Sequence, residues 1–270
     1  MIEFLLLPFL GVLIGIVAAM LGIGGGVFTV PLLTLLPLYA FPTTQAVGTS
    51  LATIIFTSLA STANYSRQKR IDRTTGLILA AATIPGAWVG AYSTSIIEER
   101  MLGLIFGIFL FFVALRMIFK FGFLSLERLS TGRGVQRRIV DSEGSVFEYD
   151  ANVRLGLALS FFGGFASGLL GIGGGAVLVP IMTLAMCIPI HVTVATSMFI
   201  MVFTSMSGVV QHFLSSNVRF EYALPLALGT VFGAQLGAHV SKKVSAVRLR
   251  RVFGVVLIFI SVRMILKFIY

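Results

Sequence analysis

The sequence has few charged side chains and almost no cysteine. Only 11% of its 270 residues are charged, against about 25% in soluble domains. This scarcity, together with 57% hydrophobic residues, excludes an ordinary cytosolic enzyme, a disordered chain and a secreted disulfide scaffold. Because Cys187 is the only cysteine, we expect neither a disulfide framework nor a cysteine metal cluster.

Charged residues are missing altogether from two long stretches. Residues 4–66 and 155–218 contain no Asp, Glu, Lys or Arg and are 63 and 64 residues long. A spanning helix needs about 20 mainly apolar residues, so each stretch has room for three crossings. A β-barrel would instead show alternating segments of about ten residues. We therefore predict an all-α polytopic membrane protein in a lipid bilayer.

The chain also lacks the patterns of several other functions. Its 20 basic residues outnumber its 10 acidic ones, but they lie in short segments between apolar runs rather than on one folded basic face, so we expect no nucleic-acid partner. The three histidines, His191, His212 and His239, have no spacing typical of a metal site. His191 or His212 as a proton relay stays an alternative. We expect no metal, no cofactor and no enzymatic activity.

The two charge-free stretches are copies of one another. The sequence LGIGGG at 21–26 recurs at 170–175, and 24 of the 80 positions in 41–120 are identical to those 147 residues later. Such likeness at a fixed offset predicts an internal repeat. We predict one repeat in 1–120, a polar linker in 121–151 and a second repeat in 152–270. The hydrophobic segments expected are 3–21, 26–40, 44–65, 75–96 and 101–120, then 152–170, 175–188, 192–214, 220–240 and 250–268.

Five segments per repeat is an odd number, so the second repeat must enter the membrane from the opposite side. The positive-inside rule tests this topology. With both termini outside, 16 of the 20 basic residues fall in cytoplasmic segments and four fall outside. This distribution favours ten segments in two inverted halves. Inverted repeats are typical of secondary transporters, whose substrate lies near the midplane where the halves meet.

The second segment of each half is unusually short. Residues 27–40 contain Pro31 and Pro37, and residues 176–188 contain Pro180. At about 1.5 Å per residue each covers roughly 20 Å, less than the ~30 Å hydrocarbon core. Short segments broken by Gly or Pro, at matching places in two halves, indicate the substrate site of a transporter.

The residues before these segments favour an anion. Glycine lets the backbone approach a ligand closely, and the helix that follows begins with unpaired N–H groups at its positive end, which bind oxyanions. The substrate-binding glycines that we predict are Gly22, Gly24, Gly25, Gly26, Gly171, Gly173, Gly174 and Gly175. The alternative is that these glycines only allow tight helix packing.

Polar side chains in the third segments extend the predicted site. Thr49, Ser50, Thr196 and Ser197 are expected to donate hydrogen bonds to the anion, although Ser and Thr in helices also bond back to their own backbone. Three further polar residues are candidates for a path through the membrane: Asn64, Gln211 and Gln235. The alternative for them is to cap or bridge helices.

These motifs resemble those of the sulfite exporter TauE/SafE family, also described as the toluene-sulfonate uptake permease group. Two glycine-rich turns are each followed by a proline, Pro31 or Pro180, and then by a Thr-Ser pair. The resemblance covers about 3–120 and 152–269 and implies a carrier in the bacterial or archaeal cytoplasmic (inner) membrane.

The implied substrate is a small sulfur-containing anion, sulfite or an organosulfonate, moved by alternating access. A passive anion channel and a transporter of another small organic anion are the alternatives. No residue pattern identifies a coupling ion or a transport direction, or distinguishes a monomer from a homo-oligomer.

Overall fold

The computed structural model describes residues 2–36, 39–119, 134–240 and 246–269. The first half forms α1 (Ile2–Leu21), α2 (Gly26–Leu35), α3 (Thr43–Arg67), α4 (Arg73–Ser93) and α5 (Glu99–Ile118). The second half forms α7 (Val153–Leu170), α8 (Gly175–Pro180), the π-helix η1 (Ile181–Ala185), α9 (Ile190–Leu214), α10 (Phe220–Val240) and α11 (Ala246–Ile269). Every predicted hydrophobic segment therefore contains a helix, with ends shifted by a few residues. Pro37 and Lys120 lie outside the described residues.

The helices have the length and surface of a membrane protein. Helices α3, α4, α5, α7 and α9 are each long and apolar enough to cross a membrane. Large aromatic side chains on the outer faces are exposed, with exposed fractions of 65% for Phe112 and 64% for Phe232. Contiguous apolar surface of this kind is rare on soluble monomers and suits contact with lipid, so the prediction of a helical membrane protein is confirmed.

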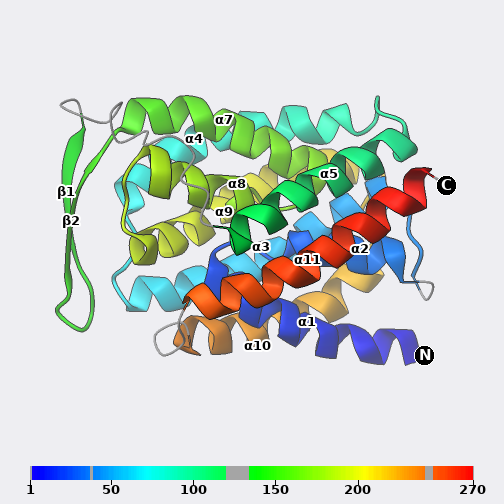
Figure 1. Ribbon diagram of the computed structural model, residues 1–270, viewed down its shortest axis with the longest axis horizontal. Coiled ribbons are helices and arrows are strands. Elements are labelled where there is room, and N and C mark those ends of the chain that lie inside the picture. Colours follow the sequence, from blue (N-terminus) through cyan, green and yellow to red (C-terminus); the bar gives the residue numbers. More distant parts are fainter. Residues whose placement is uncertain (1, 37–38, 120–133, 241–245, 270) are drawn as a thin grey trace.

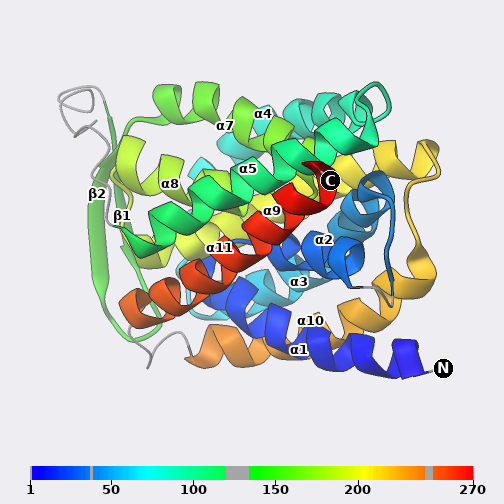
Figure 2. The ribbon, with the colours of Figure 1, turned by 45° about the vertical axis from the view of Figure 1, so that its right-hand side comes forward.

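The two halves contact each other through helix pairs that take one helix from each half. Helix α1 lies along α10, and α7 lies along α4, so the first helix of each half contacts the fourth helix of the other. Helix α5 pairs with α11, its own counterpart, and α3 pairs with α9. Figures 1 and 2 show α5 and α11 crossing the same face of the bundle. The main helix pairs between the halves thus have counterparts with the halves exchanged.

Glycines bring the paired helices into backbone contact. A Cβ on Gly15 of α1 would lie 2.8 Å from the Cα of Thr230 in α10, and a Cβ on Gly164 of α7 would lie 2.7 Å from the Cα of Thr83 in α4. Both distances are too short for a side chain, so these positions require glycine. This is the close packing that small residues provide between membrane helices, and it matches in the two halves.

The stretch between the halves contains a β-hairpin. Strand β1 (Val135–Val140) pairs antiparallel with β2 (Val146–Ala151). The expectation of an all-α protein is wrong for this part, and the linker over 121–151 stays a prediction. Along β2, Phe147, Tyr149 and Ala151 alternate with the polar Glu148 and Asp150, and Gly144, at a φ of 85°, permits the turn between the strands. Figures 1 and 2 place the hairpin across one end of the bundle, and Figure 1 shows both chain termini at the other end. Residues 121–133 lie outside the described residues.

Candidate functional site

Two glycine turns, residues 22–26 and 171–175, connect the first and second helices of each half. Three glycines in each turn have left-handed backbone angles, and the values match between the halves. Gly25 and Gly174 have φ of 91° and 87°. The remaining pairs are Gly22 at 70° with Gly171 at 68°, and Gly24 at 78° with Gly173 at 73°. Side chains rarely adopt this region, so the turn needs glycine at these positions.

The turns leave backbone donors without partners. No hydrogen bond among the described residues is donated by the N–H groups of residues 24–27, and the same holds for residues 173–176. Both glycine turns are buried. Buried N–H groups are almost always paired, so four consecutive free donors in each turn call for an acceptor. Gly25 and Gly174 are the N-caps of α2 and α8, which adds the positive end of a helix dipole.

The two turns lie against each other at the centre of the bundle. A Cβ on Gly26 would collide with the carbonyl oxygen of Gly171, and a Cβ on Gly175 would collide with that of Gly22. The glycines predicted to bind substrate are therefore brought together, and their small size is also what lets the halves meet. The packing interpretation thus applies to Gly26 and Gly175, and their role in binding substrate stays a prediction.

The hydroxyl groups of Ser50 and Ser197 hold this contact. Ser50 Oγ donates to the carbonyl oxygen of Gly171 at 2.8 Å, and Ser197 Oγ lies 3.0 Å from that of Gly22. Both serines are fully buried. Each serine belongs to one half and reaches the glycine turn of the other. The structure thus places both serines beside the turns with their protons directed at protein carbonyls, which for Ser197 include that of Val194 at 2.9 Å. Their donation to a bound anion stays a prediction.

Thr49 and Thr196 bind the loops between the third and fourth helices. Thr49 Oγ1 accepts a hydrogen bond from the N–H of Arg219 at 3.1 Å, and Thr196 Oγ1 accepts one from the N–H of Asp72 at 3.0 Å. Arg219 and Asp72 occupy the same position of the repeat, 147 residues apart. Each threonine hydroxyl accepts in these bonds, so its own proton is left to donate to a ligand.

An apolar pair at the turns was missed by sequence reasoning. A Cβ on Gly24 would lie 2.7 Å from Met201 Sδ and 3.3 Å from Ile54 Cγ2. The corresponding distances from Gly173 are 3.2 Å to Met201 Sδ and 2.9 Å to Ile54 Cγ2. Ile54 and Met201 are matched in the repeat and are buried in the centre of α3 and α9. The repeat offset was the only signal that could have picked them out among many apolar residues.

The three predicted path residues lie away from the turns. Asn64 is half-buried and Gln211 is 8% exposed. Asn64 follows Ile54 on α3, and Gln211 follows Met201 on α9. Each pair is ten positions apart, which is about 15 Å along the helix. Gln235 is exposed on α10. The structure does not bring these three side chains together, and their role as path residues stays a prediction.

A lysine caps the far end of the first broken helix. Lys267 Nζ of α11 donates to the carbonyl oxygen of Thr34, in the last turn of α2, at 2.6 Å. A cation at a helix C-terminus stabilises the helix dipole. The short helix is thus anchored by charge at its C-terminus while its N-terminus presents free donors at the glycine turn.

Comparison with known proteins gives whole-length matches. The sequence matches the family described as Sulfite exporter TauE/SafE over residues 7–264. It is 37% identical to Probable membrane transporter protein YunE of Bacillus subtilis, with 99% of each chain covered. It is 27% identical to Probable membrane transporter protein MJ0441 of Methanocaldococcus jannaschii, over 92% of this chain and 91% of the relative. Sulfite exporter TauE/SafE family protein 3 of Arabidopsis thaliana is 35% identical over 41% of this chain and 23% of its own. No solved structure matches.

Proposed function

The chain belongs to the sulfite exporter TauE/SafE family of multi-pass membrane transporters, and from this premise we propose that it moves a small sulfur-containing anion by alternating access. Sulfite and organosulfonates are the substrates that we assign to it. The proposal goes beyond the names of the relatives, several of which specify only a membrane transporter.

The observation that carries the proposal is the set of free N–H donors in the buried glycine turns. Four consecutive donors in each turn have no acceptor among the described residues. Backbone N–H groups at a helix N-terminus bind oxyanions without a fixed cation. An oxyanion with two or three oxygens, such as sulfite or a sulfonate, would satisfy several of these donors at once. The hydroxyl protons of Thr49 and Thr196 would add donors at either side.

The mutual packing of the halves supports alternating access. Secondary transporters with inverted repeats rock one half against the other around a site at the midplane. Here Ser50 and Ser197 make reciprocal bonds between the halves at the glycine turns. In the proposed cycle the two bonds lengthen in turn, so that the site opens to one face and then to the other. Ile54 and Met201 form the apolar barrier between the two openings.

We also assign an orientation in the cytoplasmic membrane. Both termini lie at the end opposite the hairpin, which supports two inverted five-helix halves with ten crossings. Sixteen of the 20 basic residues belong to segments assigned to the hairpin side. By the positive-inside rule the hairpin side is cytoplasmic and both termini are outside.

Thermal stabilisation of the purified protein by sulfite tests the substrate. A ligand that binds only the folded state raises its apparent stability by mass action, so we expect a concentration-dependent rise in melting temperature with sulfite or taurine and none with chloride. Uptake into proteoliposomes should then saturate with sulfite concentration. Non-saturating flux with unit conductance steps would favour a channel, and stabilisation only by anions without sulfur would overturn the substrate class.

A further inference from the structure

One face of the β-hairpin is built to pack against the helical bundle. Along β2, Phe147, Tyr149 and Ala151 are half-buried or buried, whereas the residues between them are exposed. Tyr149 and Ala151 share a buried apolar cluster with Met186 and other residues of α8, η1 and α9. The hairpin therefore covers the broken helix of the second half.

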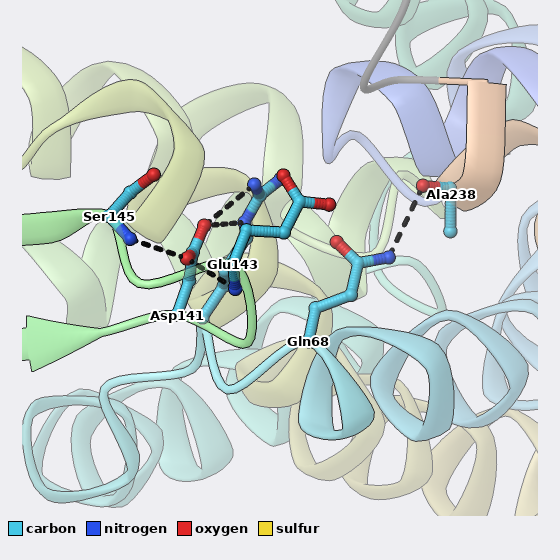
Figure 3. Close-up of polar contacts among 6 residues, drawn as sticks. Gln68, Asp141, Glu143, Ser145 and Ala238 are labelled. Atoms are coloured by element: carbon cyan, nitrogen blue, oxygen red, sulfur yellow. Dashed lines mark hydrogen bonds and ion pairs between the residues drawn. The ribbon is translucent and has the colours of Figure 1, made fainter.

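A buried ion pair holds the tip of the hairpin. Arg70, in the loop after α3, donates to Asp141 Oδ2 from Nη2 at 2.8 Å and from Nε at 3.2 Å. The side chain of Asp141 is fully buried, and its Oδ1 accepts the N–H groups of Glu143 and Ser145 at 2.9 Å each. Figure 3 shows Asp141 enclosed by these two donors, with Gln68 of the same loop reaching toward another helix. Every acceptor oxygen of Asp141 is thus used, which makes the tip a specific attachment.

A second attachment connects the hairpin to the candidate site. The hydroxyl of Tyr149 donates to Asp72 Oδ2 at 2.8 Å. Burial and the carboxylate raise the pKa of Tyr149, so the phenol keeps its proton for this bond. The N–H of Asp72 in turn donates to Thr196 Oγ1. A chain of two hydrogen bonds therefore joins the hairpin to Thr196, the residue before Ser197.

The matched loop at the other end of the bundle has no such cover among the described residues. Arg219 stands at the repeat position of Asp72 and makes the same backbone bond, to Thr49. Its side chain is 50% exposed, whereas that of Asp72 is 6% exposed. The two loops related by the repeat thus differ in their cover: the hairpin packs over the loop that holds Asp72, and no strand among the described residues covers the loop that holds Arg219.

We propose that the hairpin is a latched gate over the entrance on its own side of the membrane. Arg70–Asp141 and Tyr149–Asp72 are the latch, and Asp72 is a positioning residue that sets the Thr196 hydroxyl according to whether the hairpin is docked. The gate opens when the inner face of β2 leaves α9. This proposal rests on the transport function but on no particular substrate.

Labelling of the native Cys187 tests the gate without any substrate. Cys187 is half-buried and lies between Met186 and Ile188, two members of the cluster under the hairpin, so we expect undocking to raise its exposure. In purified protein we expect Asp141→Asn and Tyr149→Phe each to raise its maleimide labelling rate about tenfold, since each removes a hydrogen bond that involves a charged group. Glu148→Gln, on the outer face, should leave the rate unchanged.

A second reporter separates local opening from unfolding. A Gln45→Cys variant in a Cys187→Ser background places the thiol at the opposite entrance, where Gln45 bonds Arg219. Its labelling should not respond to Asp141→Asn. The gate would be overturned if Cys187 were labelled at the same rate in the native protein and in the Asp141→Asn and Tyr149→Phe variants. It would also be overturned if Asp141→Asn raised the labelling rates of Cys187 and of the Gln45→Cys thiol equally.

Locking the hairpin tests whether transport needs it to move. The rings of Phe147 and His191 in α9 are 6.2 Å apart, so Phe147→Cys with His191→Cys, in the Cys187→Ser background, can be joined by a short bifunctional thiosulfonate. We expect sulfite flux to fall at least tenfold and to recover with dithiothreitol. The matched control joins Val140→Cys to Val146→Cys, paired within the hairpin, and should keep its flux.

This experiment distinguishes a failure of the proposed gate from a failure of the proposed substrate. Undiminished flux after the Phe147–His191 positions are joined would overturn the gate and leave the substrate assignment standing. If the reduced protein moves no sulfite, the substrate assignment fails, and the labelling of Cys187 decides the gate.

Discussion

Ser50 donates a 2.8 Å hydrogen bond to the carbonyl oxygen of Gly171, in the glycine turn of the opposite half. Ser197 is the counterpart of Ser50 and lies 3.0 Å from the carbonyl of Gly22. These two contacts join the halves at the buried turns, whose N–H donors have no acceptor among the described residues. The same few residues therefore link the two halves and frame the proposed anion site.

Removing either serine hydroxyl should destabilise the junction. Ser50→Ala leaves a buried carbonyl without this donor, which costs roughly 1–3 kcal/mol in the free energy of unfolding, and Ser197→Ala should behave alike. The measurement is the apparent melting temperature in detergent, with the half-buried Ser93→Ala as control, since Ser93 Oγ bonds Val89 in its own helix. Equal melting temperatures for Ser50→Ala and Ser93→Ala would contradict the role of the junction.

Adding a methyl group at the glycine turns should abolish sulfite-dependent stabilisation. Gly25→Ala and Gly174→Ala force a side chain into φ of 91° and 87°, at a cost of roughly 1–2 kcal/mol, and misdirect the free N–H groups. Gly144→Ala is the matched control, because its φ is 85° and nothing lies within 4 Å of the added Cβ. It should keep the sulfite shift. Retention of the full shift in both turn variants would refute the site.

Shortening the central apolar pair should open a leak. Ile54→Ala or Met201→Ala removes a buried side chain between the turns, which costs about 2–5 kcal/mol and leaves a cavity. We expect passive sulfite efflux from loaded proteoliposomes to rise, while Leu59→Ala, exposed on the same helix, leaves it unchanged. An unaltered leak in a folded Ile54→Ala protein would show that the pair is no barrier.

Acid should release the tip of the hairpin. Burial raises the pKa of Asp141, but the Arg70 guanidinium and two backbone N–H groups lower it further, so the net pKa is below its ordinary value. A carboxylate with a lowered pKa contributes stability that is present above its unfolded pKa and is lost as the pH falls through the folded one, here below about pH 4. Hydrogen exchange of residues 141–146, corrected for intrinsic rates, should accelerate there. In Asp141→Asn it should be fast at every pH.

Much of the helical framework could be predicted because it depends on composition and repetition. The charge-free stretches and the offset of 147 residues located the helices within a few residues of where they occur. The glycine turns were recognisable because backbone angles such as those of Gly25 and Gly174 exclude other residues. Two copies of a turn that requires glycine are visible in the sequence itself.

The parts that the sequence did not reveal depend on contacts between distant residues. Ile54 and Met201 are apolar residues in apolar helices, and only the meeting of the two turns makes them special. Ser50 and Ser197 each reach a carbonyl in the opposite half, which spacing could not show, whereas the second acceptor of Ser197, the carbonyl of Val194 at 2.9 Å, lies in its own helix. The apolar residues Phe147, Tyr149 and Ala151 alternate with polar ones, a pattern that indicates a strand. Because the surrounding segment is rich in polar residues, we interpreted it as a linker and did not predict the hairpin.

The central claim is that the glycine turns bind and carry a sulfur oxyanion. The most direct measurement is initial sulfite uptake into proteoliposomes as a function of sulfite concentration, for the native protein, Gly25→Ala and Gly144→Ala. The account predicts saturable uptake by the native protein and by Gly144→Ala, and none above empty vesicles for Gly25→Ala. Saturable uptake that is equal in all three proteins would contradict it.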